Sequence, residues 1–307
     1  MNPKKLDHFL KVAQAGSVSR AADRMQMSQP TLSREIRELE TELGVVLLSR
    51  HSRGVGLTAA GEALKHRAEL VLNLLETLRD EVGAASDEPS GRVGIGLPTS
   101  MTGSLSTPLL TEYRARYPLV RISLREAPSN QLRSLLMQRE LDFAILSAPV
   151  SEPQLVLRPL ITEPFVLVGP AGCPLTSRRQ LTIDEVVDYP LIVPVRPNAT
   201  RTLIDTAVER TGRVPKIVLE TDAWPAADYI SAGIGYAVLP ASSAVSTHMV
   251  AAGVVSVPIK GMSITRLLAT PAGASMSLAT HKMILMLCEV VKAAIAAKRL
   301  RATYVGP

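Results

Sequence analysis

The chain has few of the residues that build disulfide frameworks or metal centres. Its 307 residues include two cysteines, Cys173 and Cys288, which lie far apart, whereas a disulfide-stapled domain carries several at short spacings. The histidines are scattered without the spacing of metal ligands: His8, His51, His66, His248 and His281. We therefore expect unpaired thiols, no metal site and no cofactor.

Long apolar runs are also missing. A charged residue interrupts every apolar stretch before the roughly 20 residues that a membrane-spanning helix needs. The N-terminal residues lead straight into an amphipathic segment, without the apolar core and cleavage site of a secretory signal. These absences predict a cytoplasmic protein with no membrane partner.

The sequence lacks the common catalytic signatures. Gly94 and Gly96 follow a predicted strand but the third glycine of a dinucleotide fingerprint is missing, and Gly233 and Gly235 follow a predicted helix. No nucleophile elbow, zinc-peptidase helix or phosphate-cradling loop is found. An enzyme is therefore disfavoured.

Basic charge is concentrated at the N-terminal end. The chain carries 34 Lys and Arg against 28 Asp and Glu, a net charge of +6. Residues 1–68 hold 11 of these basic and 7 of these acidic residues, or +4, which leaves +2 for the remaining 239. This imbalance is typical of a segment that meets phosphates.

Residues 16–43 predict two short helices joined by a turn. Ser17 is suited to cap the first, and Ser28 followed by Pro30 is suited to begin the second. Apolar residues of the second repeat at helical spacing: Leu32, Ile36, Leu39 and Leu43. Such a pair, with polar residues and arginine early in the second helix, fits a DNA major groove, although an ordinary helical hairpin with a solvated charged face has the same spacing.

A hairpin and a long helix are predicted next. Residues 45–49 and 55–57 read as strands around a basic turn, where Arg53 could enter an adjacent minor groove or stay a solvated loop residue. Thr58 is suited to cap a helix that runs to about residue 86. Its apolar positions follow the steps of a coiled-coil seam: Leu64, Ala68, Val71, Leu75, Leu78, Val82 and Ala85. This stripe could pair with a second subunit or pack on the chain's own second domain.

Beyond a polar hinge at residues 84–90, strands alternate with helices, which predicts a mainly parallel sheet covered by helices. The expected strands are 92–97, 120–126, 141–146, 165–168, 191–195, 216–220, 236–239 and 264–270. The expected helices are 105–117, 130–138, 183–187, 202–209, 226–232 and 278–297.

The chain resembles the LysR-type transcriptional regulators. The N-terminal signature lies at Phe9, Val12, Gly16, Ser17, Ala21, Ala22, Ser28, Gln29, Pro30, Ser33, Ile36, Leu39, Glu40, Leu43, Gly44, Arg50, Leu57, Thr58 and Gly61. It departs at Leu48, where phenylalanine is usual, and at Met25, where leucine is usual. Residues 141–145, 163–168 and 232–240 are similar to the effector domain of the same family.

The resemblance implies an α/β protein with a winged helix-turn-helix (1–58), a linker and dimerisation helix (59–88) and a two-lobed effector domain built like a periplasmic binding protein (89–307). Lobe I would span about 91–162 and 269–307, and lobe II about 163–268. We expect a sequence-specific regulator that binds a double-stranded DNA operator and a small-molecule effector, as a homodimer through the linker helix and a homotetramer in the working unit. A transport binding protein is the alternative for the C-terminal region, but it would require export.

The expected DNA-binding residues are Ser28, Gln29, Pro30, Thr31, Ser33, Arg34, Arg37, Arg50 and Arg53. Among them we predict a bidentate base contact for Arg34, a phosphate contact for Ser33 and a minor-groove contact for Arg53.

The expected effector-binding residues are Thr99, Ser100, Thr102, Ser129, Ser147, Pro197, Asn198, Thr200 and Trp224. The resemblance implies that all of them except Trp224 face the effector cleft. Hydroxyl groups near a helix start could orient a carboxylate, which suggests a small organic anion or polar metabolite, but ordinary N-capping explains them equally well. Arg201 is either a countercharge or a solvated residue, and Trp224 either a cleft wall or plain packing.

Overall fold

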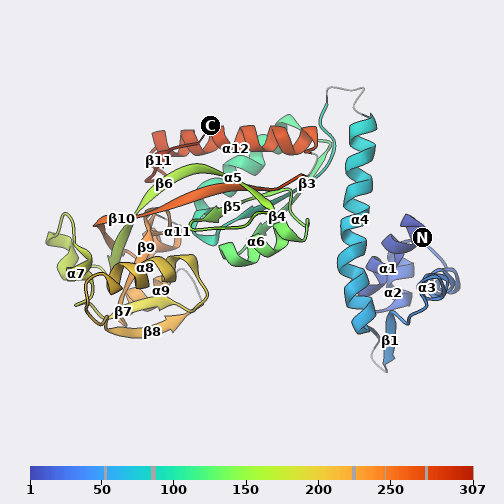
Figure 1. Ribbon diagram of the computed structural model, residues 1–307, viewed down its shortest axis with the longest axis horizontal. Helices are drawn as coiled ribbons and strands as arrows, with labels where there is room; N and C mark the ends of the chain where they lie inside the picture. The colour runs from blue at the N-terminus through green and yellow to red at the C-terminus, as the bar shows by residue number, and fades with distance from the viewer. Residues whose placement is uncertain (52–53, 84–87, 223–225, 246, 274–275, 307) are drawn as a thin grey trace. The chain divides into compact units, whose positions relative to one another are not determined.

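The computed structural model describes residues 1–51, 54–83, 88–222, 226–245, 247–273 and 276–306. Contacts within the chain divide it into two compact units, Met1–Asp87 and Glu88–Pro307. The labels in Figure 1 follow the elements of both units in chain order.

The N-terminal unit is a winged helix-turn-helix. Its helices are α1 (Pro3–Ala15), α2 (Val18–Arg24), α3 (Gln29–Leu43) and α4 (Ala59–Gly83). The wing consists of β1 (Leu48–His51) and β2 (Gly54–Leu57), which pair antiparallel. Phe9, Leu32 and Leu39 lie fully buried where α1 to α3 meet. Stabilisation by burial of apolar side chains therefore holds the helix pair in place.

The wing begins later than the sequence pattern predicts. The expected strand 45–49 is replaced by β1 from Leu48, and Val45 and Val46 are exposed. Glu40 Oε1 accepts hydrogen bonds from the backbone N–H groups of Leu47 (2.8 Å) and Leu48 (3.2 Å). This carboxylate of α3 thus fixes the turn that delays the strand.

The apolar seam of α4 divides in two. Thr58 caps the helix as expected, since its hydroxyl accepts from Gly61 N at 3.0 Å. Leu64 and Ala68 pack into the core of the N-terminal unit, whereas Val71 and Leu78 are 39% and 46% exposed. The side chains of Val82 and Ala85 lie outside the described residues. Only the later part of the described seam is therefore open to a partner.

The C-terminal unit is an α/β structure. Its strands are β3 (Gly91–Leu97), β4 (Val120–Glu126), β5 (Phe143–Ser147), β6 (Leu155–Gly169), β7 (Leu191–Pro194), β8 (Ile217–Thr221), β9 (Tyr236–Pro240), β10 (Val255–Pro271) and β11 (Thr303–Tyr304). Its helices are α5 (Thr99–Arg116), α6 (Ser129–Met137), η1 (Pro174–Ser177), α7 (Ile183–Val186), α8 (Ala199–Glu209), α9 (Ala227–Ser231), α10 (Ala241–Ala244), α11 (Thr247–Ala251) and α12 (Leu278–Ala296).

One sheet runs through both halves of this unit in the order β4-β3-β5-β10-β6-β9-β7-β8, with β11 beside β6. The outer strands pair in parallel on each side: β3 with β4 and β5, and β7 with β8 and β9. The long strands β6 and β10 cross the middle and pair antiparallel with each other and with their neighbours. We call the β3–β5 side lobe I and the β7–β9 side lobe II (Figure 1).

The strand pairing moves one expected lobe boundary. Arg266 to Ala269 of β10 pair with β5, so residues 266–269 belong with lobe I, whose second segment was expected to begin at about residue 269. In lobe I, α5 and α12 share one core and α6 contributes to a separate one. Helices of lobe II likewise contribute to two cores.

Two features of the C-terminal unit differ from the sequence-based expectation. Helix α5 begins at Thr99 rather than at 105, because Pro98 supplies an extended N-cap and Pro108 is accommodated inside the helix. The strands β6 and β10 extend through Pro159, Pro164 and Pro258, residues that usually interrupt a sheet. Register irregularities in the β6–β10 ladder accommodate this, including one between Pro258 and Ser263.

Candidate functional sites

The first candidate site is the exposed face of α3. Ser28 caps the helix: its hydroxyl accepts from Thr31 N at 3.3 Å and lies 2.7 Å from Thr31 Oγ1. Gln29, Pro30 and Arg34 are exposed, Arg34 with 70% of its side chain accessible. These side chains come from the first two turns of α3, and in helix-turn-helix proteins this is the part of the recognition helix that reaches base edges.

Ser33 differs from its expected neighbours. It is only 7% exposed, its hydroxyl accepts a long bond from Gln29 Nε2 (3.5 Å), and its carbonyl accepts from Arg37 Nε (3.3 Å). Ser33 directly follows buried Leu32 and precedes buried Ile36 by about one turn, so its small side chain falls at the edge of the apolar stripe. A direct phosphate contact by Ser33 would require this face to open.

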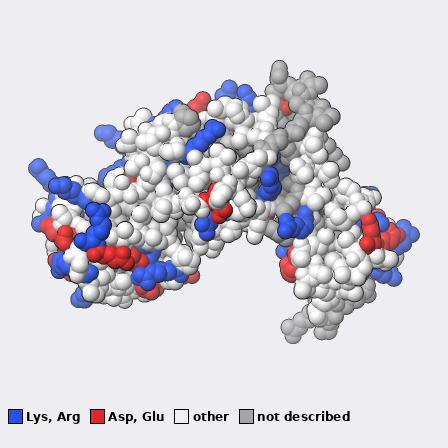
Figure 2. Space-filling view, in the orientation of Figure 1, with Lys and Arg blue, Asp and Glu red and all other residues white. Residues whose placement is uncertain are grey.

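Lys5 of α1 forms an ion pair with Glu38 of α3. Basic and acidic side chains lie next to each other over α3 (Figure 2). Lys5 Nζ lies 2.8 Å from Glu38 Oε2, and Arg34 Nε lies 3.8 Å from Glu38 Oε1. The hydrogen bond from Lys5 lowers the pKa of Glu38, and the same bond raises the pKa of Lys5. Lys5 and Arg34, with Arg37, border an open surface hollow of about 760 Å³. Two of the cations that face an approaching anion, Lys5 and Arg34, are therefore already paired with the carboxylate of Glu38.

The wing arginines are described only in part. Arg50 lies in β1 opposite Val55, and its side chain is outside the described residues, as is the whole of Arg53. The base of the wing is fixed to the helices, since Val55 N donates to Gly16 O at 3.0 Å.

The second candidate site is a cleft of about 330 Å³ in the C-terminal unit. Residues of both lobes line it: Pro98–Ser100, Pro128–Gln131 and Ser147 from lobe I, and Pro194–Thr200, Thr221, Asp222 and Pro240 from lobe II, with Arg266 from the crossing strand β10. Most of these residues lie at or just after the carboxyl ends of parallel strands. Ligands of open α/β sheets bind at this edge.

Helices α5, α6 and α8 all begin at this cleft. Pro98 and Pro128 occupy the N-cap positions of α5 and α6, and neither helix has a side-chain cap. At α8, in contrast, Asn198 Oδ1 accepts from Thr200 N (2.9 Å) and Arg201 N (3.2 Å). Ordinary capping therefore does not explain the hydroxyls after Pro98 and Pro128, and the first N–H groups of α5 and α6 are available to an anion.

A buried ion pair lies at the centre of the unit. Arg266 on β10 and Glu163 on β6 are 2% and 0% exposed, and Nε lies 2.7 Å from Oε1. Glu163 Oε2 accepts from Ser242 N at 2.9 Å. Such a pair needs all its polar atoms satisfied to offset desolvation, and the remaining guanidinium nitrogens reach the cleft.

These nitrogens set the direction of two cleft hydroxyls. Arg266 donates to Ser147 Oγ and, at 2.9 Å, to Ser100 Oγ. Ser129 joins the same network, because its hydroxyl accepts from Ser147 N at 2.9 Å and lies 3.0 Å from Ser147 Oγ. An oxygen that accepts from guanidinium leaves its own O–H to be donated. The hydroxyls of Ser100 and Ser147 are thus poised as donors.

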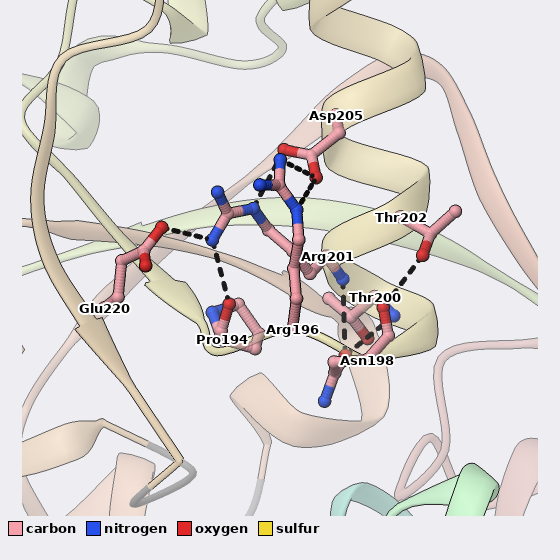
Figure 3. Close-up of polar contacts among 8 residues, drawn as sticks. All are labelled: Pro194, Arg196, Asn198, Thr200, Arg201, Thr202, Asp205 and Glu220. Carbon is pink, nitrogen blue, oxygen red and sulfur yellow. Dashed lines mark hydrogen bonds and ion pairs between the residues drawn. The ribbon is translucent and has the colours of Figure 1, made fainter.

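Arginines of lobe II are committed to carboxylates (Figure 3). Arg201, only 3% exposed, donates to Asp205 (2.8 Å), Glu220 (2.7 Å) and Pro194 O (3.0 Å). Arg196, whose side chain is 67% exposed, donates to the other oxygen of Asp205 at 2.7 Å. Burial raises the pKa of Asp205, but the hydrogen bonds from Arg201 and Arg196 outweigh it and hold that pKa below its ordinary value.

The expected effector residues divide into three groups. Seven line the cleft: Thr99, Ser100, Ser129, Ser147, Pro197, Asn198 and Thr200. Thr102 is not among the lining residues; its hydroxyl donates to Pro98 O at 3.3 Å within α5. Trp224 lies outside the described residues. Arg201 is a buried structural residue rather than a countercharge facing the cleft.

Arg266 and Arg196 line the cleft and were missed from the sequence. The signal for Arg266 was a lone arginine inside an apolar strand, a placement that requires a buried partner. Its partner Glu163 is 103 positions away, so no pattern of neighbouring residues predicts the pair.

Both cysteines are buried and unpaired. Within the described ranges, no three His, Cys, Asp or Glu residues gather as metal ligands, and none of the helices found there is long and apolar enough to cross a membrane.

Comparison with known proteins assigns both units. Residues 3–62 match the family described as bacterial regulatory helix-turn-helix protein, lysR family, and residues 86–292 match the LysR substrate binding domain. The chain belongs to the LysR family of transcriptional regulators. As a LysR regulator it is a DNA-binding protein and not an enzyme.

Individual relatives span most of the chain. The HTH-type transcriptional regulator AlsR of Bacillus subtilis is 34% identical over 79% of this chain and 82% of its own. The nitrogen assimilation regulatory protein nac of Escherichia coli is 30% identical over 97% of this chain and 98% of its own.

Solved LysR structures share the fold. A full-length OxyR variant from Pseudomonas aeruginosa superposes with a TM-score of 0.71 at 25% identity, covering 95% of each chain. Full-length CbnR complexed with its target DNA gives 0.70 at 23% identity, covering 96% of this chain and 100% of that one.

Proposed function

We propose that this LysR regulator binds an operator through α3 and the wing, and that a small organic anion in the inter-lobe cleft modulates its DNA binding or promoter activation. The observation that carries the ligand class is the donor set of the cleft. The uncapped N–H groups of α5 and α6 can donate to a ligand in the cavity, and so can the hydroxyls of Ser100 and Ser147, whose oxygens accept from Arg266.

The hydrogen-bond donors of the inter-lobe cleft, rather than a net positive charge, favour an anionic ligand. Arg266 is offset by Glu163 and Arg196 by Asp205, and Asp222 adds a carboxylate to the lining. A ligand that offers acceptor oxygens to oriented N–H and O–H groups replaces the water it loses. An ammonium group would instead leave those donors unpaired.

The DNA contacts follow from the exposed face of α3. We assign a bidentate base contact to Arg34, supporting contacts to Ser28, Gln29, Pro30, Thr31 and Arg37, and wing contacts to Arg50 and Arg53. The structure of CbnR with its target DNA supports duplex DNA as the partner, since it shares this chain's fold.

A homodimer through α4 is the proposed functional unit. Val71, Leu74 and Leu78 lie at helical spacing and are 39%, 61% and 46% exposed, which leaves an apolar stripe for a second copy. A ligand that binds one lobe arrangement better would shift the spacing of the two DNA heads. Assembly into a homotetramer through effector domains follows the family resemblance, as does action in the cytoplasm, where the operator lies.

The DNA-binding proposal is tested by pulling down genomic fragments with the purified full-length protein at rising salt. Nonspecific phosphate binding weakens steeply with ionic strength. We expect a few dyad-symmetric sites to persist; uniform retention that vanishes with salt would contradict an operator-specific regulator.

The ligand-class proposal is tested by thermal shift with pairs of carboxylates and their neutral amides at matched ionic strength. We expect one or more acids to raise the unfolding temperature while their amides do not. Ser100→Ala should reduce that shift, and Ser104→Ala, on the same helix outside the cleft lining, should leave it intact. Stabilisation by amides and acids alike would contradict anion recognition.

A further inference from the structure

A second hollow lies in lobe I, on the α12 side of the sheet. It encloses about 560 Å³, against about 330 Å³ for the inter-lobe cleft. One wall is a continuous face of α12, with residues at steps of three and four: His281, Ile284, Leu285, Cys288, Glu289 and Lys292. The other wall is formed by β6 and β10, where Val156 pairs with Thr270 and Arg158 with Leu268.

The hollow exists because α12 does not cover the last strand of lobe I. The N-terminal half of β6 pairs with β10, and its outer neighbours β11 and β9 join only from Ile161 onward. Val156 and Leu285 are therefore 41% and 47% exposed, while Leu268 and Cys288 lie buried at 4% and 8%. Apolar surface of this kind beside a buried floor is typical of a binding site.

Charge at the rim selects the partner. The lining includes two basic side chains, Arg158 and Lys292, and one carboxylate, Glu289. Lys292 Nζ lies 4.5 Å from the centroid of the Tyr304 ring, so the ammonium charge of Lys292 takes part in a cation–π interaction. Over the part of the chain that the structure describes, Arg158 has neither an ion pair nor a hydrogen bond, so its planar fork is available for a carboxylate.

We propose that this groove binds an amphipathic carboxylate, with its apolar body against Val156, Leu268 and Leu285 and its carboxylate on Arg158. The site is separate from the inter-lobe cleft: none of the lining residues is shared. The regulator thus has two ligand sites of different chemistry, a polar one between the lobes and an apolar one beside α12.

The test uses the full-length protein and 4-fluorophenylacetate as probe, followed by fluorine NMR relaxation of the ligand. Its neutral isostere 4-fluorophenylacetamide measures the share of the carboxylate. We expect the acid to bind and Arg158→Gln to weaken it roughly tenfold, as loss of a charge-assisted bond predicts. The matched control Arg121→Gln removes an exposed arginine of β4 outside the groove and should leave binding unchanged.

A second readout locates the probe. In a Cys173→Ser background Cys288 is the single cysteine, and it lines the groove, so bound probe should slow its alkylation by N-ethylmaleimide. Leu285→Asp, at an exposed position, should abolish both binding and protection without affecting folding.

Several results would overturn the proposal. Equal binding of acid and amide would remove the role of Arg158, and no binding at 10 mM probe would remove the site. Loss of binding in Ser100→Ala but not in Arg158→Gln would place the probe in the inter-lobe cleft. A lower sedimentation mass for Leu285→Asp than for wild type would show that a second copy of the chain occupies the groove instead.

Discussion

At the scale of single residues, Arg34 carries the sharpest prediction for DNA binding. Its side chain is exposed and its nearest charged partner, Glu38, lies 3.8 Å away, so little holds it back from a base. Arg34→Ala should cost about 1–3 kcal/mol on the operator and relax preference at one base pair. Fluorescence anisotropy on operator variants measures this. Arg34→Lys keeps the charge but not the fork, and an equal loss on operator and random DNA would mean a phosphate contact only.

Arg266 and Glu163 give a prediction for stability. Arg266→Met leaves a fully buried carboxylate without its guanidinium, and removal of one partner of a buried pair typically costs about 3–5 kcal/mol. Urea unfolding followed by fluorescence or circular dichroism gives the loss. Because Glu163→Gln/Arg266→Met buries no lone charge, the double variant should lose less than the sum of the single losses. Additive losses would contradict a coupled pair.

Asp205 gives a pH prediction. Its pKa is below the ordinary value in the folded protein, so the stabilisation it contributes is complete above the unfolded pKa of about 4 and is lost as pH falls through the folded pKa. Asp205→Asn should lower stability at pH 7 by roughly 1–3 kcal/mol, since charged hydrogen bonds are lost. The gap from wild type should narrow below about pH 4. Urea midpoints from pH 3 to 7 test this, and a constant gap would show that Asp205 is protonated alike in both states.

The residues of the cleft were only partly accessible from sequence. Thr99, Ser100, Ser129 and Ser147 could be anticipated because the family resemblance implies that they face the effector cleft, and the structure places them after strands, at the edge where parallel sheets bind ligands. Arg266 could not, because its partner Glu163 lies 103 positions away along the chain, on another strand. Sequence patterns relate residues that lie near each other along the chain, whereas this ion pair forms only when two distant strands come together in the fold.

At the scale of elements, the sequence predicts helix ends correctly where the capping residue directly adjoins the helix. Ser17 and Ser28 cap the starts of α2 and α3 as the sequence predicts, and Gly44 ends α3 in the left-handed conformation. The start of α5 was placed six residues late, because a proline and a run of hydroxyl residues resemble a loop. The long strands β6 and β10 were recognised only in part, since prolines break their pattern while pairing between the strands restores it.

The exposed part of α4 gives a prediction at this scale. Leu78→Glu places a charge on the stripe formed with Val71 and Leu74, without disturbing the buried Ala68 end. We expect dimers to dissociate at micromolar concentration, because two like charges would face each other across the seam. Sedimentation velocity measures the mass. Lys65→Glu, at a partly exposed position that helical spacing places on the opposite side of α4 from this stripe, is the control. An unchanged profile for Leu78→Glu would contradict pairing through α4.

At the scale of the whole molecule, a dimer should read two half-sites as one operator. Two recognition helices related by a two-fold axis meet the same face of DNA only when half-sites are separated by whole turns of about 10.5 base pairs. Inserting about 5 base pairs should therefore weaken wild-type binding sharply, and inserting about 10 should restore part of it. Leu78→Glu should bind all three spacings with the affinity of a single half-site, because each head then binds alone. Gel-shift titrations at fixed salt decide between these outcomes. If wild type were insensitive to spacing, the heads would be independent, and the link from cleft occupancy to head spacing would have to be abandoned while the contacts of α3 stood.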